Sequence, residues 1–440
     1  MKAIILAAGE GSRMKAEMPK VLHTIAGQPI LHHVIKACLA ANITDLAVVV
    51  GNKGQAVIDA TPFPVQFVWQ HEQLGTGHAV GCARSFIAAG EADEDVLVLN
   101  GDTPLITAAF LEALQAARQR ESAAGLVVST TLPNPFGYGR VFTGPDGTFQ
   151  EIVEQKDLLP GQDTHTQVNT GVCVYAADAL LYGLDNIRND NQQCEYYLTD
   201  VPGVLRKAGR RVVVFHSEDG AQFSGINTQK QLAEAAAYLR ARINDMHMEN
   251  GVVMLDPATT YIDAAVDIAP QVVIHPGVML EGATRIGRGT TLLPYTRITD
   301  SEVGQHTSVG PFACLRAGAR VGNHCRIGNF VEIKNSQVGD HTNAAHLAYI
   351  GDADVGDRVN FGCGAVTVNY DGEKKHRTTV ENDVFVGCNA NLVAPITVHT
   401  GAYVAAGSTI VSEVPEEALA IARERQTNKT GWVSKYRRKG

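Results

Sequence analysis

The chain has 440 residues, of which 45% are hydrophobic and 19% are charged, and its formal net charge at pH 7 is −9. Because this length exceeds what a typical single core supports, we expect two or three domains. The acidic balance argues against nucleic acid as the main partner, since binding to a phosphate backbone needs a basic surface. The sequence lacks the run of roughly eighteen apolar residues that a membrane span requires. It begins directly with a predicted strand, so no signal peptide is expected.

The eight cysteines are scattered along the chain and include no Cys-x-x-Cys pair. A disulfide framework would show a denser and more regular spacing. The cysteines are therefore typical of a protein in a reducing cytoplasm, with mostly buried and unreactive thiols.

The N-terminal segment combines a predicted buried strand at residues 2–6 with the loop LAAGEGSRM at residues 6–14 and the dipeptide Pro19-Lys20. Small residues and two glycines allow the backbone to pass close to a ligand. Successive N–H groups in such a loop can bind phosphate oxygens. Arg13 and Lys20 add positive charge that suits a polyphosphate.

Two common nucleotide-binding fingerprints do not fit this loop. The dinucleotide fingerprint needs a third glycine where Met14 stands, and an acidic residue where residues 48–50 lead into Gly51. The Walker lysine-serine pair is also missing. A bare Gly-x-Gly turn would equally fit an ordinary tight turn with two surface cations. The complete pattern resembles the signature of nucleotidyltransferases that join a nucleoside triphosphate to a sugar 1-phosphate.

Predicted strands and helices alternate through the first half of the chain. A helix with proline at its start is predicted at residues 29–39. Such alternation implies a Rossmann-like α/β fold with a mostly parallel sheet, whose ligands bind at the carboxyl ends of the strands. Further strands are predicted at residues 46–50, 65–69, 96–99, 126–131, 172–175 and 212–215.

Polar residues follow several of these strands, as a ligand site requires. Gln70 follows one strand, and the turn at Gly75-Thr76 opens a helix whose amides can face a base or a phosphate. Asn100-Gly101-Asp102 follows another strand, where a carboxylate can hold Mg²⁺, a hard cation that prefers oxygen ligands. Taken singly, several of the polar residues would fit turn formers or helix caps better than ligand-binding residues: Asp102, Glu154, Asn169 and Asn227.

Along their whole length, residues 1–227 resemble the uridylyltransferase domain of the bifunctional N-acetylglucosamine-1-phosphate uridylyltransferase/glucosamine-1-phosphate acetyltransferase family. The resemblance implies that a sugar phosphate oxygen attacks the α-phosphorus of UTP, which needs positioning and charge neutralisation rather than a protein nucleophile. It places the nucleotide against Leu6, Ala7, Ala8, Gly9, Gln70, Gly75 and Thr76, with Asn100 and Gly101 beside it. It makes Arg13 and Lys20 the residues that face the phosphates, Asp102 and Asn227 the Mg²⁺ ligands, and Gly139, Glu154 and Asn169 the lining of the sugar pocket.

The periodicity changes in the second half. A helix is predicted over residues 228–250, because apolar residues recur there at three- and four-residue spacing. Beyond it an apolar residue recurs every sixth position, which a parallel β-helix produces and a helix or alternating strand does not. The series comprises Ile262, Ile268, Ile274, Leu280, Ile286, Leu292 and Ile298, then, after a one-residue slip, Val303, Val309, Leu315, Val321, Ile327 and Ile333, and finally Val386, Leu392, Val398, Val404 and Ile410. We therefore expect a nucleotidyltransferase domain at residues 1–227, a linker helix at 228–250 and a β-helix domain with a C-terminal tail at 251–440.

The six-residue repeat falters between Val338 and Val386, and insertions into a solenoid map to its binding face. His346 lies in this stretch, and an imidazole titrates in the range needed to accept a proton from an amine. By itself, His346 would also fit a surface or interface histidine. Other polar side chains gather in or just before the same stretch: Arg316, Lys334, Tyr349, Asn360, Asn369, Tyr370 and Lys375.

Residues 251–440 resemble the acetyltransferase domain of the same family. The resemblance implies a left-handed, triangular β-helix and a homotrimer that binds acetyl-CoA between neighbouring prisms. It makes His346 the general base, and places Arg316, Lys334, Tyr349, Asn360 and Lys375 around the sugar phosphate. It places Cys363, Asn369, Tyr370, Cys388, Ala406 and Arg423 at acetyl-CoA. Cys363 and Cys388 stand where relatives often have alanine and serine, and a thiol is a weaker hydrogen-bonding group than a hydroxyl.

Three functions remain in competition. The first is a bifunctional enzyme that makes UDP-N-acetylglucosamine, a precursor of peptidoglycan and lipopolysaccharide, from glucosamine 1-phosphate, acetyl-CoA and UTP with Mg²⁺. The second is a nucleotidyltransferase of another sugar with a non-catalytic β-helix, and the third is a non-catalytic sugar-nucleotide sensor. The residues from His346 to Lys375 argue against the second, and Lys20 with Asp102 and Asn227 argues against the third. A basic run at residues 435–439 is interpreted as a solvated chain end.

Overall fold

The computed structural model describes residues 1–437. The chain divides into two compact units, Met1–Leu239 and Arg240–Gly440, called unit 1 and unit 2 below. The division falls within helix α8 (Gln229–Glu249), whose bounds lie within one residue of the predicted helix at each end. Among residues 1–437, no helix combines the length and the apolar character that crossing a membrane requires.

Unit 1 is built on a mixed sheet with the strand order β11-β7-β10-β6-β1-β4-β5. Strand β10 runs antiparallel to both neighbours, while the other neighbours on this path are parallel. The expectation of a mostly parallel sheet is confirmed except at β10, which the chain enters from a hairpin rather than from a crossover helix. The strands are β1 (Lys2–Ala7), β4 (Leu46–Val50), β5 (Gln66–Trp69), β6 (Asp95–Asn100), β7 (Gly125–Thr131), β10 (Gln167–Ala176) and β11 (Val212–Ser217), with β8 (Arg140–Thr143) and β9 (Phe149–Val153) forming the hairpin.

Alternate residues of the strands enter two separate apolar cores, one on each face of the sheet. In β1, Ala3 and Ile5 pack into one core and Ile4 into the other, as the two-residue period of a strand requires. Residues of α1 and α5 complete the first core, and residues of α3, α4, α6 and α7 complete the second. The helices are α1 (Ile30–Ala40), α2 (Gly54–Ala60), α3 (Thr76–Cys82), α4 (Arg84–Ala88), α5 (Ala108–Glu121), α6 (Ala177–Asn186) and α7 (Val201–Lys207).

Short elements complete unit 1 and extend the loops that follow the strands. They are the 3₁₀ helices η1 (Ser12–Met14), η2 (Lys20–Leu22), η3 (Gln155–Asp157), η4 (Leu198–Asp200) and η5 (Ala221–Phe223), and the hairpin of β2 (Thr24–Ile25) and β3 (Gln28–Pro29). Both η1 and η2 follow β1, so the first loop of the chain turns twice before α1 begins.

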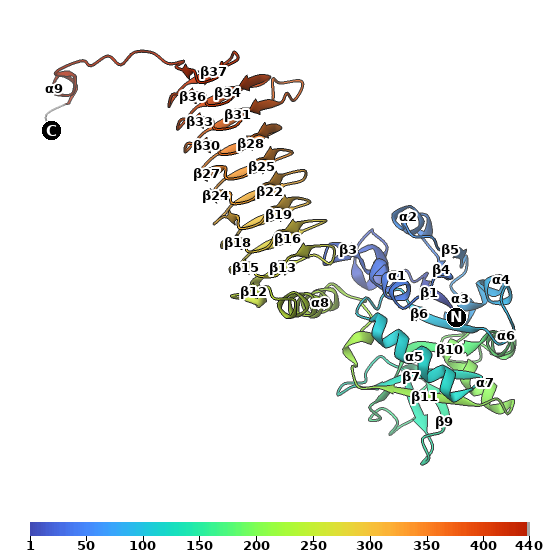
Figure 1. Ribbon diagram of the computed structural model, residues 1–440. Coiled ribbons are helices and arrows are strands. Elements are labelled where there is room, and N and C mark those ends of the chain that lie inside the picture. The colour runs from blue at the N-terminus through green and yellow to red at the C-terminus, as the bar shows by residue number, and fades with distance from the viewer. Residues whose placement is uncertain (438–440) are drawn as a thin grey trace. The chain divides into compact units, whose positions relative to one another are not determined.

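Unit 2 is a left-handed β-helix whose successive coils contribute short strands to three parallel sheets, and the last two coils lack strands in one or two of the sheets (Figure 1). The first sheet contains β12 (Val253–Met254), β15 (Val273–Ile274), β18 (Thr291–Leu292), β21 (Ser308–Val309), β24 (Arg326–Asn329), β27 (Asn343–His346), β30 (Asn360–Phe361), β33 (Phe385–Val386), β36 (Tyr403–Val404) and β38 (Leu419–Ala420). The second contains β13 (Tyr261–Ile262), β16 (Met279–Glu281), β19 (Arg297–Thr299), β22 (Cys314–Arg316), β25 (Glu332–Lys334), β28 (Tyr349–Gly351), β31 (Val366–Val368), β34 (Asn391–Val393) and β37 (Thr409–Ile410). The third contains β14 (Asp267–Ile268), β17 (Arg285–Ile286), β20 (Glu302–Val303), β23 (Arg320–Val321), β26 (Gln337–Val338), β29 (Ala353–Val355), β32 (Thr378–Val380) and β35 (Ile396–Val398), and η6 (Pro257–Thr259) lies in the first coil.

The predicted apolar series forms the interior of the β-helix. Every predicted member from Ile262 to Ile410 is at most 6% exposed. The predicted interruption between Val338 and Val386 is too wide, because the buried column continues through it. Ala344, Phe361 and Thr367 occupy interior positions there, and these residue types hide the aliphatic pattern in the sequence. The true insertion is the loop of residues 369–377 between β31 and β32.

The C-terminal segment leaves the β-helix after β38 and is exposed along its described length, including the short helix α9 (Trp432–Tyr436). Lys435, Tyr436 and Arg437 of the predicted basic run are exposed. The other two members, Arg438 and Lys439, lie outside the described residues.

Candidate active sites

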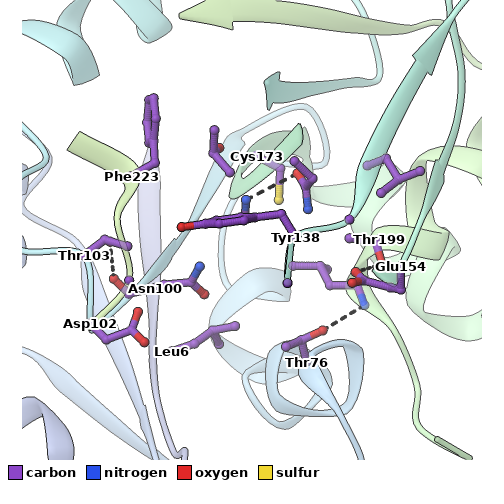
Figure 2. A pocket seen from close by; sticks show the side chains of 18 of the residues that line it. Leu6, Thr76, Asn100, Asp102, Thr103, Tyr138, Glu154, Cys173, Thr199 and Phe223 are labelled. Atoms are coloured by element: carbon purple, nitrogen blue, oxygen red, sulfur yellow. Dashed lines mark hydrogen bonds between the residues drawn. The ribbon is translucent and has the colours of Figure 1, made fainter. Parts of the chain in front are cut away.

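A cavity of about 510 Å³ opens beside the carboxyl ends of β1 and β6 in unit 1. Figure 2 shows Asn100 and Asp102 on one side of this cavity and Glu154 and Thr199 on the other. A second cavity, of about 300 Å³, lies next to it, and the two share several lining residues: Leu6, Thr76, Asn100 and Asp102. The pair of cavities provides room for two ligands that meet near Asp102.

The second cavity is surrounded by the residues predicted to bind the nucleotide. Gly11 has a φ of 65°, and a Cβ there would lie 2.7 Å from the Cβ of Lys20, so only glycine fits this turn. Gln73, which the sequence did not single out, donates from Nε2 to the carbonyl oxygen of Ala8 at 2.8 Å and fixes the loop. The lining includes Leu6, Ala7, Ala8, Gly9, Lys20, Gln70, Gly75 and Thr76.

Four predicted residues form a polar cluster where the two cavities meet. Nζ of Lys20 lies 2.5 Å from Oδ2 of Asp102 and donates to Oδ1 of Asn227 at 3.1 Å. The guanidinium of Arg13 donates to the same Oδ1 at 2.9 Å. The 3₁₀ helix η2 begins at Lys20, and the backbone N–H of Ile226 donates to the carbonyl of Asp102 at 3.0 Å. Segments far apart in the sequence therefore converge on one charged centre.

The oxygen atoms of this cluster fit a magnesium site. A carboxylate and an amide oxygen reach one ammonium group, so both already face the position of a cation. Mg²⁺ is usually held by one or two protein oxygens together with substrate phosphates and water. Residues 1–437 contain no group of three or more His, Cys, Asp or Glu side chains arranged to hold a metal.

The three residues predicted to bind the sugar, Gly139, Glu154 and Asn169, all line the first cavity. Oε1 of Glu154 accepts a hydrogen bond from Oγ1 of Thr199 at 2.9 Å, and burial raises the pKa of this carboxyl. The backbone N–H of Asn169 donates to the carbonyl of Gly139 at 2.9 Å. The ladder between β10 and β7 shifts register after Asn169, and this bulge opens the sheet at the cavity.

Asp200, which follows the cavity residue Thr199, has an altered pKa whose effect on stability can be measured. Burial raises the pKa of Asp200 to about 6, and Glu154, Asp157 and Asp190 add like charge. The Asp200 carboxyl therefore binds a proton more tightly in the folded state than in the unfolded state. Above about pH 6 the carboxyl is ionised in both states, and its charge lowers the free energy of unfolding. This destabilisation disappears as the pH falls toward about 4, where the folded state is protonated. We expect Asp200→Asn to raise the free energy of unfolding at pH 7.5 by roughly 1 kcal/mol, allowing for partial exposure, and to leave it unchanged near pH 4. Urea unfolding at the two pH values measures the difference.

Asp178→Asn is the matched control, because Asp178 forms a surface ion pair with Arg210 at 2.8 Å. This variant should be neutral or slightly less stable at pH 7.5. An Asp200→Asn variant that gains nothing at pH 7.5, or gains as much at pH 4, would contradict the assigned environment of Asp200.

In unit 2, His346 stands at the end of β27, directly above Asn329 of the preceding coil. The two residues are register partners, and Nδ1 of His346 lies 2.6 Å from Oδ1 of Asn329. An amide oxygen accepts and cannot donate, so this contact places the imidazole proton on Nδ1. Nε2 is then left with a free lone pair, as a general base requires.

The predicted cations Arg316, Lys334 and Lys375 lie beside the second sheet of the β-helix. The ammonium of Lys334 lowers the pKa of Lys375, through a direct contact and through like charge. Two adjacent ammonium groups suit a doubly charged phosphate, which relieves their repulsion. Arg316 is the register partner of Lys334, and its guanidinium lies 2.7 Å from a carboxylate oxygen of Glu332. Tyr349 lies above Glu332 on the next coil.

The residues expected at acetyl-CoA are only partly gathered. Cys363, Cys388 and Ala406 occupy equivalent positions on three successive coils, each two residues after a register partner in the first sheet. Asn360 precedes them in β30, and the inserted loop supplies Asn369, Tyr370 and Lys375. Arg423 lies in the exposed segment beyond β38 and is not brought to these coils by any described contact in residues 1–437.

Several contacting residues were missed by sequence reasoning. Asn329 precedes His346 by 17 residues, and Asn335 precedes Asp352 by the same interval, which is one coil of this β-helix. Other coils are one residue longer, as between Leu315 and Ile333, so only the strand register identifies these partners. Gln73 and Thr199 carry no comparable signal, because loops of unit 1 bring them to the site.

Comparison of the sequence with family models and with known proteins identifies its family. A family model of the MobA-like NTP transferase domain matches residues 3–155, and one of the bacterial transferase hexapeptide, with six repeats, matches residues 300–335. A protein named Bifunctional protein GlmU from Brevibacillus brevis is 44% identical, over 100% of this chain and 98% of its own. Its namesake from Clostridium tetani is 45% identical, over 98% of both chains. The chain belongs to the bifunctional GlmU family.

As a GlmU family member, the chain is an enzyme of UDP-N-acetylglucosamine synthesis with uridylyltransferase and acetyltransferase activities. This result confirms the two activities of the first function and sets aside the non-catalytic β-helix and the sensor, whereas the use of Mg²⁺ stays a prediction. The predicted fold class is confirmed as well, since a nucleotidyltransferase unit is followed by a left-handed β-helix of hexapeptide repeats.

Proposed function

We propose that the cleft of unit 1 performs uridylyl transfer to N-acetylglucosamine 1-phosphate and that the His346 region of unit 2 performs acetyl transfer to glucosamine 1-phosphate. The observation that carries the first assignment is the cluster of Lys20, Asp102, Asn227 and Arg13 beside the glycine loop. The second rests on His346, whose Nδ1 contacts Asn329 at 2.6 Å.

In unit 1, the residues that line the smaller cavity bind the uridine nucleotide, and Glu154, Asn169 and Gly139 bind the acetylated sugar. Arg13 and Lys20 neutralise charge that builds up on the phosphate oxygens during the displacement. Asp102 and Asn227 would hold Mg²⁺, which supplies Lewis-acid neutralisation of the phosphate charge when bound. Because the attacking oxygen already belongs to a phosphate, the protein needs no nucleophile of its own.

In unit 2, Nε2 of His346 accepts a proton from the amine of glucosamine 1-phosphate, so that the nitrogen lone pair can attack the thioester carbon. The C–N bond of the amide forms, the C–S bond breaks, and coenzyme A takes up a proton and leaves as the thiol. Asn329 keeps the imidazole in the required tautomer. Lys334, Lys375 and Arg316 hold the sugar phosphate, with Tyr349 and Asn360 beside it. Acetyl-CoA contacts are assigned to Cys363, Asn369, Tyr370, Cys388, Ala406 and Arg423, and Cys388 offers only a weak hydrogen bond.

A substrate panel tests these assignments. The protein is incubated with glucosamine, N-acetylglucosamine or glucose 1-phosphate against UTP, ATP or dTTP, with and without acetyl-CoA. We expect a nucleotide sugar from N-acetylglucosamine 1-phosphate and UTP, and from glucosamine 1-phosphate only when acetyl-CoA is added. A faster reaction with another sugar or nucleotide would refute the substrate assignment.

We propose further that the protein acts in the cytoplasm as a homotrimer assembled through unit 2. All eight cysteines are free thiols, in keeping with a reducing compartment. The β-helix carries a column of stacked aromatic side chains on its outer surface, in which Tyr295, Phe312 and Phe330 are 60%, 47% and 55% exposed. Large exposed aromatic side chains are typical of a surface that another subunit covers.

Truncation after Asn250 tests the assembly. This cut retains helix α8, in which Ala235 and Leu239 are buried and Gln231 accepts a hydrogen bond from the backbone N–H of Asn227. We expect a monomer that keeps uridylyl transfer and lacks acetyl transfer, whereas the full chain has three times the mass of one chain by light scattering. A monomeric full-length protein would rule out the trimer.

A further inference from the structure

The inserted loop of residues 369–377 is fastened to the β-helix at both ends by Asp352. Oδ2 of Asp352 accepts a hydrogen bond from Nδ2 of Asn369, the first residue of the loop, at 2.5 Å. Its backbone carbonyl accepts a hydrogen bond from the N–H of Thr378, the first residue after the loop, at 3.1 Å. Oδ1 is occupied as well, because Nδ2 of Asn335 donates to it at 2.6 Å. Asp352 thus joins three successive coils through one side chain and one carbonyl.

The Asp352 carboxylate is also close enough to Lys334 and Lys375 for their charges to act on it. The residue is 5% exposed, and burial raises its pKa. The amides of Asn335 and Asn369 and the charges of Lys334 and Lys375 outweigh burial and hold this pKa below its ordinary value. The carboxylate in turn raises the pKa of Lys375, against the larger effect of Lys334.

Other titratable groups face this centre from the elements packed against it. Tyr349 of β28 acts on Lys375 in the same direction as Asp352. Arg377, at the end of the loop, is influenced by Asp352 but forms its ion pair with Asp354 of β29. The loop is therefore held by a buried carboxylate on one side and an exposed ion pair on the other.

We propose that Asp352 is a positioning residue for acetyl transfer, which holds the inserted loop so that Lys375 lies next to Lys334. This inference rests on the proposed acetyl transfer in unit 2. A purely structural role at this position needs two acceptor oxygens, one for each asparagine amide, but no negative charge. Asp352 has a φ of 50°, and asparagine adopts this left-handed conformation readily and has nearly the same shape. The negative charge is the property that only the functional role uses.

Asp352→Asn tests the proposal in the full-length protein. The variant keeps the shape but loses the charge and turns a hydrogen-bond donor toward one of the two asparagine amides. We expect kcat/KM for acetyl transfer to fall by about 10- to 100-fold, mainly through a higher KM for glucosamine 1-phosphate. Without the carboxylate the pKa of Lys375 falls further, so the rise of this KM with pH should begin at a lower pH than in the unaltered protein.

Asp340→Asn is the matched control. Asp340 also lies one coil after an asparagine, and its Oδ1 accepts hydrogen bonds from the backbone N–H and Nδ2 of Asn323, but no loop is inserted there. This variant should keep acetyl transfer and its pH profile, and both variants should keep uridylyl transfer.

Acetyl transfer by Asp352→Asn within twofold of the unaltered protein, or a lower rate with an unshifted pH profile, would overturn the role of Asp352. Equal losses in Asp340→Asn would overturn it too. Failure of the unaltered protein to transfer acetyl groups would instead refute the proposed function, so the two failures are distinguishable.

Discussion

Replacing His346 with alanine is expected to slow acetyl transfer by about 10²–10⁴-fold, the usual contribution of a general base. The amine of glucosamine 1-phosphate is protonated at neutral pH, and a proton must leave before the nitrogen can attack a thioester. Lys334 and Lys375 lie next to each other, and the phosphate binding that we propose for them requires both to stay charged, so neither is a good base. Tyr349 has too high an ordinary pKa for the task, since an unperturbed tyrosine titrates near pH 10. His346 remains, with Nε2 free because Nδ1 is bonded to Asn329.

Release of coenzyme A, followed with a thiol reagent, measures this rate. His341→Ala is the matched control, because His341 lies in the same coil but stacks on His324 with a ring distance of 5.0 Å, at another corner. We expect this control to keep acetyl transfer within about twofold, and both variants to keep uridylyl transfer. If His346→Ala retained acetyl transfer within a few-fold, the base would have to lie elsewhere.

Replacing Asp102 with alanine is expected to reduce uridylyl transfer by about 10²–10³-fold and to leave acetyl transfer intact. The variant removes the carboxylate proposed to hold Mg²⁺, and neutralisation of phosphate charge by a metal contributes several kcal/mol to such reactions. It also removes the partner of Lys20, which lies 2.5 Å away in the structure. Pyrophosphate release, measured over a range of Mg²⁺ concentrations, follows the reaction.

Two variants refine this experiment. Asp102→Asn keeps an oxygen ligand without the charge, so high Mg²⁺ should restore part of its activity but not that of Asp102→Ala. Asp45→Ala is a neutral control, because Asp45 lies at the amino end of β4, whereas the site lies at the carboxyl ends of the strands. Undiminished uridylyl transfer in Asp102→Ala would refute the metal assignment.

The fold could be predicted from periodicity because each period has one structural meaning. The six-residue series from Ile262 to Ile410 predicts an interior column, and the structure buries all of its predicted members. The direction of β10 could not be predicted, because residues 172–175 show the same apolar pattern in a parallel or an antiparallel strand. The extent of the insertion was also overestimated, since Ala344 and Thr367 fill interior positions without looking aliphatic.

The position of Asp102 beside the glycine loop could be predicted because residues that follow neighbouring parallel strands meet at the carboxyl ends of those strands. The place of Asn227 in this site was implied only by the family resemblance. Lys20, Asp102 and Asn227 come from distant segments and meet in the structure. Their hydrogen-bond partners were harder to predict, because Thr199 and Gln73 reach the site through loop conformations that no periodic pattern encodes. In unit 2, Asn329 and His346 are separated by one coil, but this separation identifies them as partners only once the register of the strands is known.

The most direct test of two independent sites in one chain is complementation. The Asp102→Ala and His346→Ala proteins are each given glucosamine 1-phosphate, acetyl-CoA, UTP and Mg²⁺, separately and as a mixture. UDP-N-acetylglucosamine is measured by mass spectrometry. We predict little product from either variant alone and nearly full production from the mixture, since one protein supplies the acetylated sugar phosphate and the other converts it. Full production by either single variant, or a mixture as inactive as its parts, would contradict the assignment of the two reactions to these two sites.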